Sequence, residues 1–269
     1  MMFTALAAMV ATPGQQPGGF EVLVLAFAVL VSAASAGAFN QYFEVDLDSL
    51  MQRTRHRPFV TGRFHKSWVW LLLMLLLLFA GVSSAAVVLN GAAAAYIFLG
   101  AFFYAVVYTV WLKRRTWMNI VIGGASGSFA VLAGAAAVDP AMSPVPILLA
   151  LVLFFWTPSH FWSLAIAKHQ DYANAGVPML PVVIGDQRTA VVVLINTLIL
   201  VGISVLPFFF GLGWIYLAGA LAGGVYFIYC NYLMVQEPST TLAMKSFFAS
   251  LVQLVFLLAG AVLDVYLLA

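Results

Sequence analysis

Three oxygen-bearing side chains, Asn40, Glu44 and Asp48, follow one another at four-residue intervals directly after an apolar run. If the helix of that run continues, the three side chains line one face of it, and Asp46 lies off that face. Carboxylate and amide oxygens suit a hard divalent cation such as Mg²⁺, which commonly also binds phosphates. A solvated helix end is the alternative, but acidic residues oppose the macrodipole at a helix C-terminus. The pattern therefore favours a metal site.

A dense set of cationic side chains comes immediately afterwards: Arg53, Arg55, Arg57 and Arg63. Guanidinium groups match phosphate oxygens bidentately, so carboxylates, a metal and arginines together predict a diphosphate site. An ordinary positively charged loop would explain the arginines equally well, but it does not explain the acidic residues beside them.

A second charged segment begins with Lys168 and contains Asp171 three positions later. Asp171 is the candidate second metal anchor, and across a helix bundle it would face Asp48, so that two ions could neutralise a diphosphate from opposite sides. The alternative is that Asp171 only caps a short loop helix.

One histidine, His160, lies inside an apolar block, between Trp156 and Trp162. An ionisable residue within a membrane is a candidate for function. A neutral histidine bonded to a neighbouring helix is the alternative.

Helices that cross a membrane must position these residues, because 64% of the 269 residues are hydrophobic and 7% are charged, against about 25% charged in soluble domains. Backbone groups in lipid must be bonded internally, so apolar blocks of this length are helices. We predict an all-α polytopic transmembrane bundle, one domain over 1–269, with spans near 20–43, 68–89, 92–112, 119–138, 145–167, 189–211, 214–234 and 246–268. The single cysteine, Cys230, offers no disulfide and no cysteine-rich metal site.

Residues 1–12 are apolar but span only about 18 Å before Pro13. We therefore predict that they form a partial first helix, which brings the bundle to about nine helices. A short signal sequence is the alternative, although the segment has no basic start. All eleven Lys and Arg residues lie in alternate connections or at their edges. The positive-inside rule then predicts that the charged loops are cytoplasmic in a multi-pass protein of a bacterial inner membrane.

These segments resemble the UbiA superfamily of membrane prenyltransferases, and within it the haem O synthase branch. The stretch 40–48 is similar to the first aspartate-rich motif of the superfamily, and 53–63 to its continuation in the haem branch. Segments 108–124, 156–162 and 171–183 narrow the resemblance to that branch, which runs from about residue 3 to the end of the chain. Glu44 stands where the family usually has Asp, Ser159 replaces a common Pro, and the chain begins partway through the family's first helix.

The resemblance implies Mg²⁺-dependent transfer of a farnesyl group from farnesyl diphosphate to a vinyl group of haem b, followed by hydration to haem O, with haem as substrate rather than cofactor. It implies catalytic metal ligands at Asn40, Glu44, Asp48 and Asp171. It also implies substrate-binding roles for Arg53, Arg55, Arg57, Arg63, Tyr108, Lys113, Arg114, Arg115, His160, Lys168 and Tyr172.

The implied partners are small molecules and the membrane, not nucleic acid, and the product would pass to a haem A synthase or a terminal oxidase assembly pathway. Two related readings stay open: a UbiA-type enzyme that prenylates a quinone precursor such as 4-hydroxybenzoate, and a non-catalytic truncated homologue. A transporter or channel is a third, but its site is expected near the bilayer centre, whereas the charges here gather at helix ends.

Overall fold

The computed structural model describes residues 1–268, and every regular element in that range is a helix. The chain is a multi-pass membrane protein, because eight of its helical segments are long and apolar enough to cross a membrane. The predicted all-α bundle is confirmed. A ninth apolar helix, α1, is shorter and covers Met2–Ala11.

The N-terminal half supplies the helices that carry the acidic stretch and its basic partner. They are α1 (Met2–Ala11), α2 (Gly19–Phe43), α3 (Val45–Leu50), α4 (Trp68–Val88), α5 (Gly91–Phe102), the π-helix η1 (Phe103–Leu112), α6 (Asn119–Gly123) and α7 (Ala125–Ala136).

The C-terminal half begins with the helix that contains His160. Its elements are α8 (Pro144–Ala167), α9 (His169–Asn174), α10 (Leu180–Ile184), α11 (Asp186–Val205), the 3₁₀ helix η2 (Leu206–Phe210), α12 (Trp214–Gln236) and α13 (Thr240–Leu268).

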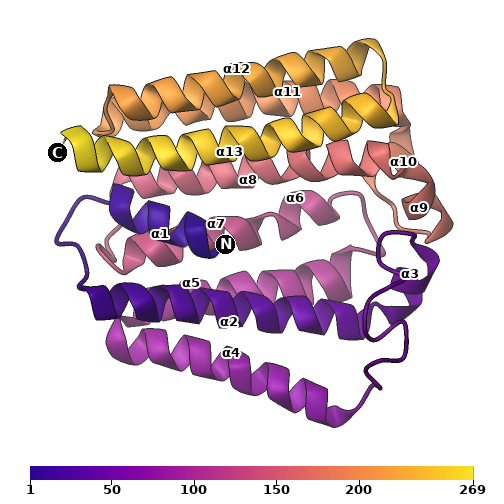
Figure 1. Cartoon of the computed structure of the whole chain (residues 1–269), viewed down its shortest axis with the longest axis horizontal. Coiled ribbons are helices and arrows are strands. Elements are labelled where there is room, and N and C mark those ends of the chain that lie inside the picture. Colours follow the sequence, from indigo (N-terminus) through magenta and orange to yellow (C-terminus); the bar gives the residue numbers. More distant parts are fainter. Residues whose placement is uncertain (269) are drawn as a thin grey trace.

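The helices form two groups with a thinner layer between them. Helices α8, α11, α12 and α13 pack together in one group, and α2, α4 and α5 in the other, with α1, α6 and α7 between (Figure 1). Helix α1 crosses α7 at Gly134, where an added Cβ would lie 1.9 Å from the Ala5 carbonyl oxygen. Only glycine permits that crossing.

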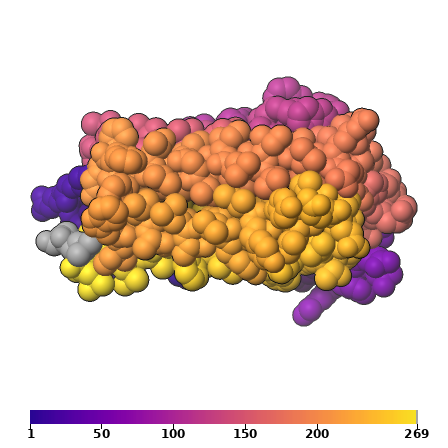
Figure 2. All heavy atoms as spheres, turned by 90° about the horizontal axis from the view of Figure 1, so that it is seen from above, coloured from indigo at the N-terminus to yellow at the C-terminus, as the bar shows by residue number. Residues whose placement is uncertain are grey.

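The charged segments gather at one end of the bundle. Figure 1 shows α3, α9 and α10 at the same end, opposite the C-terminus. Seen from above, residues near 50 (purple) extend beyond the ends of α12 and α13 (Figure 2). This common placement agrees with alternate connections sharing one side of the membrane, as the distribution of Lys and Arg predicts.

The helices differ most clearly from the sequence-based expectation at two places. The helix through Asn40 does not continue: α2 ends at Phe43, and Glu44 (φ −97°, ψ 23°) joins it to α3. The last helix begins at Thr240 and not at 246, so Lys245 lies inside the helix and not before it. Lys245 is exposed, and its ammonium lies 5.6 Å from the centre of the Tyr229 ring, so the helix carries this charge on its surface.

A hydrogen-bonded network of side chains joins α8, α11, α12 and α13. The Ser246 hydroxyl donates to the Asn231 side-chain oxygen (2.6 Å), and the Asn231 amide donates to Thr197 (3.0 Å). Thr197 contacts Ser159 (2.8 Å), and Ser163 contacts Ser246 (2.8 Å). All five residues are fully buried. Ser159 therefore supplies a hydroxyl that links two helices, and in lipid such bonds hold helices in register.

Candidate active site

A cavity of about 410 Å³ lies between the two helix groups, close to the charged end. One part of its wall is polar, with side chains of Asn40, Asp48, Arg53, Arg57, Lys113 and Tyr172. The rest is mostly apolar and includes Val29, Ile97, Ala130, Leu153 and Trp156. A cavity with one charged end and one long apolar arm fits an amphipathic ligand that carries an anionic head.

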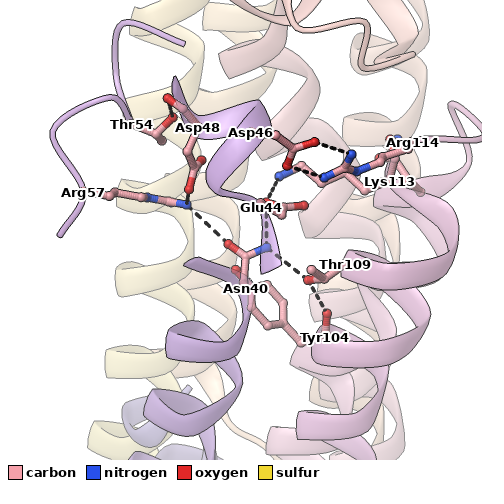
Figure 3. Close-up of polar contacts among 11 residues, drawn as sticks. Asn40, Glu44, Asp46, Asp48, Thr54, Arg57, Tyr104, Thr109, Lys113 and Arg114 are labelled. Carbon is pink, nitrogen blue, oxygen red and sulfur yellow. Dashed lines mark hydrogen bonds and ion pairs between the residues drawn. The ribbon is translucent and has the colours of Figure 1, made fainter. Parts of the chain in front are cut away.

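The acidic stretch stays together although its helix is interrupted. Asn40, Glu44 and Asp48 are buried, with 3%, 0% and 2% of their surface exposed. The Asn40 amide donates to Glu44 Oε2 (2.8 Å) and to Thr109 Oγ1 (3.0 Å), as Figure 3 shows. The Asp48 amide donates to the Glu44 carbonyl (2.8 Å), so the short helix α3 keeps Asp48 on the side of Asn40.

Each buried carboxylate has a cationic partner. Arg57 donates from Nη1 to Asp48 Oδ2 (2.6 Å) and reaches Asn40 Oδ1 at 3.4 Å. The Lys113 ammonium donates to Glu44 Oε2 (Figure 3). Burial lowers the pKa of Lys113, and the charge of Glu44 opposes that shift. The predicted set of acceptors beside donors is therefore present, already paired internally.

Asp46 points away from this cluster, as its position off the face predicts. Its side chain is 63% exposed and accepts two hydrogen bonds of 2.7 Å from Arg114. The Arg114 guanidinium holds the pKa of the Asp46 carboxyl below its usual value. Arg114 thus ties the start of α3 to the end of η1, and its predicted contact with substrate stays a prediction.

The π-helix η1 presents two tyrosines to the cavity. Tyr104 and Tyr108 both line it and stack with ring centres 5.6 Å apart. Thr109 donates to the Tyr104 carbonyl (2.8 Å), a contact five residues back along the chain. Gly123 makes room for Tyr108, because an added Cβ would lie 2.8 Å from its ring. Widened turns of this kind are frequent at functional sites.

The loop after α8 reaches the polar end through Tyr172. Tyr172 is buried and lines the cavity, as does Arg53. Burial raises the pKa of the Tyr172 hydroxyl, and the nearby Arg53 guanidinium opposes the shift. Asp171 is only partly buried, and within the described residues the cavity wall does not include it. Its role as second metal anchor stays a prediction.

Besides Arg114, four of the predicted substrate-binding residues lie away from the wall as the structure describes it. Arg55, Arg63 and Arg115 are exposed and Lys168 is partly exposed. Their exposure places them around the charged end, and their contacts with a substrate stay predictions.

His160 forms part of the opposite wall, where its ring is tightly held. It stacks on Trp156 (centres 4.2 Å apart) and on Phe247 (4.3 Å), and its Nδ1 lies 2.7 Å from the Ser250 hydroxyl. Phe247 and Ser250 come from α13, far away in the sequence.

Sequence reasoning missed several residues of the site. Tyr104 has one signal, its four-residue spacing from Tyr108, which puts both on one helix face. Trp156 lies in segment 156–162 and Thr109 in segment 108–124, but neither pattern predicts a role in the site. Phe247 and Ser250 carry no local signal, because their contact with α8 depends on how the last helix packs.

Comparisons with known proteins agree with this geometry. A family model described as the UbiA prenyltransferase family matches residues 1–257. The chain is 54% identical over 266 residues to Protoheme IX farnesyltransferase 2 of Paramagnetospirillum magneticum, covering 98% of this chain and 92% of that protein. It is 40% identical to Protoheme IX farnesyltransferase of Alkalilimnicola ehrlichii, covering 98% and 87%.

Solved structures share the fold at low sequence identity. A structure of digeranylgeranylglyceryl phosphate synthase superposes with a TM-score of 0.82 at 18% identity, covering 98% of this chain and 92% of the other. A UbiA homologue from Archaeoglobus fulgidus bound to DMAPP and Mg²⁺ superposes with a TM-score of 0.73 at 15% identity, covering 95% and 94%.

Proposed function

This chain belongs to the UbiA prenyltransferase family, and we propose that it transfers a farnesyl group from farnesyl diphosphate to a vinyl group of haem b, giving haem O and diphosphate. The proposal rests on one observation: the same cavity has an end lined by cationic and acidic side chains and a largely apolar arm. The relatives named Protoheme IX farnesyltransferase support the choice of farnesyl donor and haem acceptor.

Magnesium fits the residues at the polar end. Glu44 Oε1 is fully buried and has no hydrogen-bond partner within the described residues, which is an unfavourable state for a carboxylate oxygen unless a ligand completes it. The side chains that could coordinate an ion there, Asn40, Glu44 and Asp48, all offer oxygen atoms, which are the ligands that Mg²⁺ prefers. Among the described residues no three His, Cys, Asp or Glu side chains converge, so phosphate oxygens and water would complete the coordination.

Asn40, Glu44 and Asp48, with Asp171, would hold the ion, and when bound it neutralises charge on the departing diphosphate. Lys113, Arg53 and Arg57 would donate hydrogen bonds to the diphosphate oxygens. To do so, Lys113 and Arg57 exchange their present carboxylate partners for phosphate oxygens, which leaves the carboxylates for the metal.

The apolar arm would hold the farnesyl chain and exclude water from the allylic cation that forms when the diphosphate leaves. The rings of Tyr104 and Tyr108 line the cavity near its polar end, where their electron-rich faces would stabilise a nearby positive charge. In this proposal haem b lies with a vinyl group beside the cation and His160 on the opposite wall.

Placement in a bacterial inner membrane, with the charged loops cytoplasmic, belongs to the same proposal. So do the single domain over 1–269 and the passing of haem O to a haem A synthase or a terminal oxidase assembly pathway.

The test uses membranes that contain the full chain, incubated with haem b, farnesyl diphosphate and Mg²⁺, with the haem products separated by chromatography and weighed by mass spectrometry. We expect haem O, lost on chelation of Mg²⁺ and in the Asp48→Asn variant. Asp46→Asn is the matched control, because Asp46 is exposed and pairs only with Arg114. A parallel incubation contains 4-hydroxybenzoate as well. Prenylation of 4-hydroxybenzoate without any change in haem would contradict the proposal, and so would the absence of any product.

A further inference from the structure

The hydrogen bonds around His160 determine which of its ring nitrogens carries the proton. Ser250 donates its hydroxyl hydrogen to the Phe247 carbonyl (2.6 Å). A hydroxyl has one hydrogen, so the 2.7 Å contact between Ser250 Oγ and His160 Nδ1 requires the histidine to donate. In the neutral ring Nδ1 is therefore protonated and Nε2 carries the lone pair. The described residues give Nε2 no hydrogen-bond partner, and His160 lines the cavity.

Both faces of the imidazole are covered by larger rings. Trp156 stacks on it at an interplanar angle of 18° and Phe247 at 29°, and Phe161 meets it edge-on with centres 4.9 Å apart. What remains open is the ring edge that carries Nε2. Water can approach a lone pair in that position. A porphyrin whose iron bonded to Nε2 would lie across the plane of the imidazole. It would then contact the edges of the Trp156 and Phe247 rings, which lie against the imidazole.

We propose that His160 Nε2 accepts a proton from the water that completes the reaction, and that Ser250 is a positioning residue that fixes the required tautomer. This inference rests on the proposed farnesyl transfer to haem b. The terminal vinyl carbon uses its π electrons to bond to C1 of the farnesyl cation, after the C1–O bond has broken and the diphosphate has left. The positive charge then lies on the vinyl carbon next to the porphyrin ring.

Water attacks that carbon: a C–O bond forms, one O–H bond breaks, and the proton goes to Nε2. Haem b, farnesyl diphosphate and water thus give haem O, diphosphate and a proton, with no change in oxidation state overall. If no base accepts the proton of the attacking water, the cation instead gives a proton from its neighbouring carbon to the released diphosphate. The product is then an alkene that is lighter than haem O by one water.

The product ratio tests the proposal. Purified full-length protein receives haem b, farnesyl diphosphate, Mg²⁺ and water labelled with heavy oxygen, and the yields of labelled haem O and of the anhydrous adduct are compared. We expect His160→Gln to slow formation of haem O by about 100-fold or more, as for loss of a general base, and to raise the anhydrous fraction. Ser250→Ala keeps the histidine but releases its tautomer, so we expect about a tenfold loss of haem O with the same change in ratio.

Two further variants separate positioning from folding. Ser250→Thr keeps a hydroxyl and should restore the wild-type ratio. Ser246→Ala removes a hydroxyl one turn earlier on α13, within the buried network and without contact to His160, and should leave the ratio unchanged. A merely structural role of Ser250 would lower both products together and would not change their ratio.

Several results would overturn the inference. One is an unchanged ratio in Ser250→Ala or His160→Gln that still forms product. Another is a changed absorption spectrum of bound haem b in His160→Gln with haem O still the product, which would make the histidine an iron ligand. If the wild-type chain forms no farnesylated haem, the proposed function fails as well. If it forms haem O and only the ratios disagree, the function stands and the inference fails.

Discussion

The ion pair between Arg57 and Asp48 is unequally buried, and this predicts an asymmetric response to its removal. The Asp48 side chain is 2% exposed, whereas the Arg57 side chain is 25% exposed. In Arg57→Met the charge left behind is a carboxylate enclosed by protein. In Asp48→Asn it is a guanidinium that water can reach. The first variant should therefore lose more stability than the second.

The magnitudes follow from that difference. Removing one partner of a buried pair is destabilising by about 3–5 kcal/mol, and because Arg57 is partly hydrated we take about 3 kcal/mol for Arg57→Met. An exposed pair contributes about 0–1 kcal/mol, and we take about 1 kcal/mol for Asp48→Asn. At about 2–4 °C for each kcal/mol, the melting temperature should fall by about 6–12 °C and by about 2–4 °C. The double variant leaves no isolated charge, so it should recover most of the loss seen in Arg57→Met.

Thermal unfolding of the detergent-solubilised protein, without Mg²⁺ or diphosphate and followed by tryptophan fluorescence, measures these shifts. Arg55→Met is the control, because Arg55 is exposed and belongs to the same segment, and its melting temperature should not change. If Asp48→Asn melts as low as Arg57→Met, or if the double variant recovers nothing, unequal burial does not govern the pair.

Three further predictions concern topology, the metal site and packing. In a Cys230→Ala background, a cysteine at position 62 should react with an impermeant maleimide only from the cytoplasmic face. Labelling from outside intact cells would contradict the predicted topology. Glu44→Asp keeps the carboxylate and introduces the residue that the resemblance implies, so haem O formation should persist or rise. Loss of haem O formation would show that the site depends on the longer side chain. Gly123→Val places a side chain where an added Cβ lies 2.8 Å from the Tyr108 ring, and it should lower the stability by about 1–3 kcal/mol and also lower the turnover, while unchanged turnover would remove Tyr108 from the site.

The membrane spans were predictable because lipid allows few solutions. An apolar block of about twenty residues must form a helix, so the sequence places the spans to within a few residues in most cases. The interruption at Glu44 and the π-helical turns of η1 were not predictable. Both depend on contacts with distant segments, such as the bond from Lys113 to Glu44.

The part of the candidate site that consists of charged and amide side chains was predictable, because such residues are rare in an apolar chain. Charged and amide side chains are few, and Asn40, Asp48, Arg57 and Lys113 indeed meet at one cavity. Residues of common type were not predictable, because many aromatic side chains occur and only packing decides which of them face inward. Ser250 is such a case, one hydroxyl among many on apolar helices.

The buried hydroxyl and amide network has a consequence for how the bundle assembles. Helix α13 is synthesised after the three helices that it joins, α8, α11 and α12, and it brings Ser246, which completes the bonding of Asn231. Until α13 docks, the side-chain oxygen of Asn231 lacks this hydrogen-bond donor, and an unsatisfied polar group is unfavourable in lipid. A shift of α13 by one residue would turn both Ser246 and Ser250 away from their partners. Correct insertion of α13 thus selects one register, and the orientation of His160 is fixed only after α13 has joined the helices made before it.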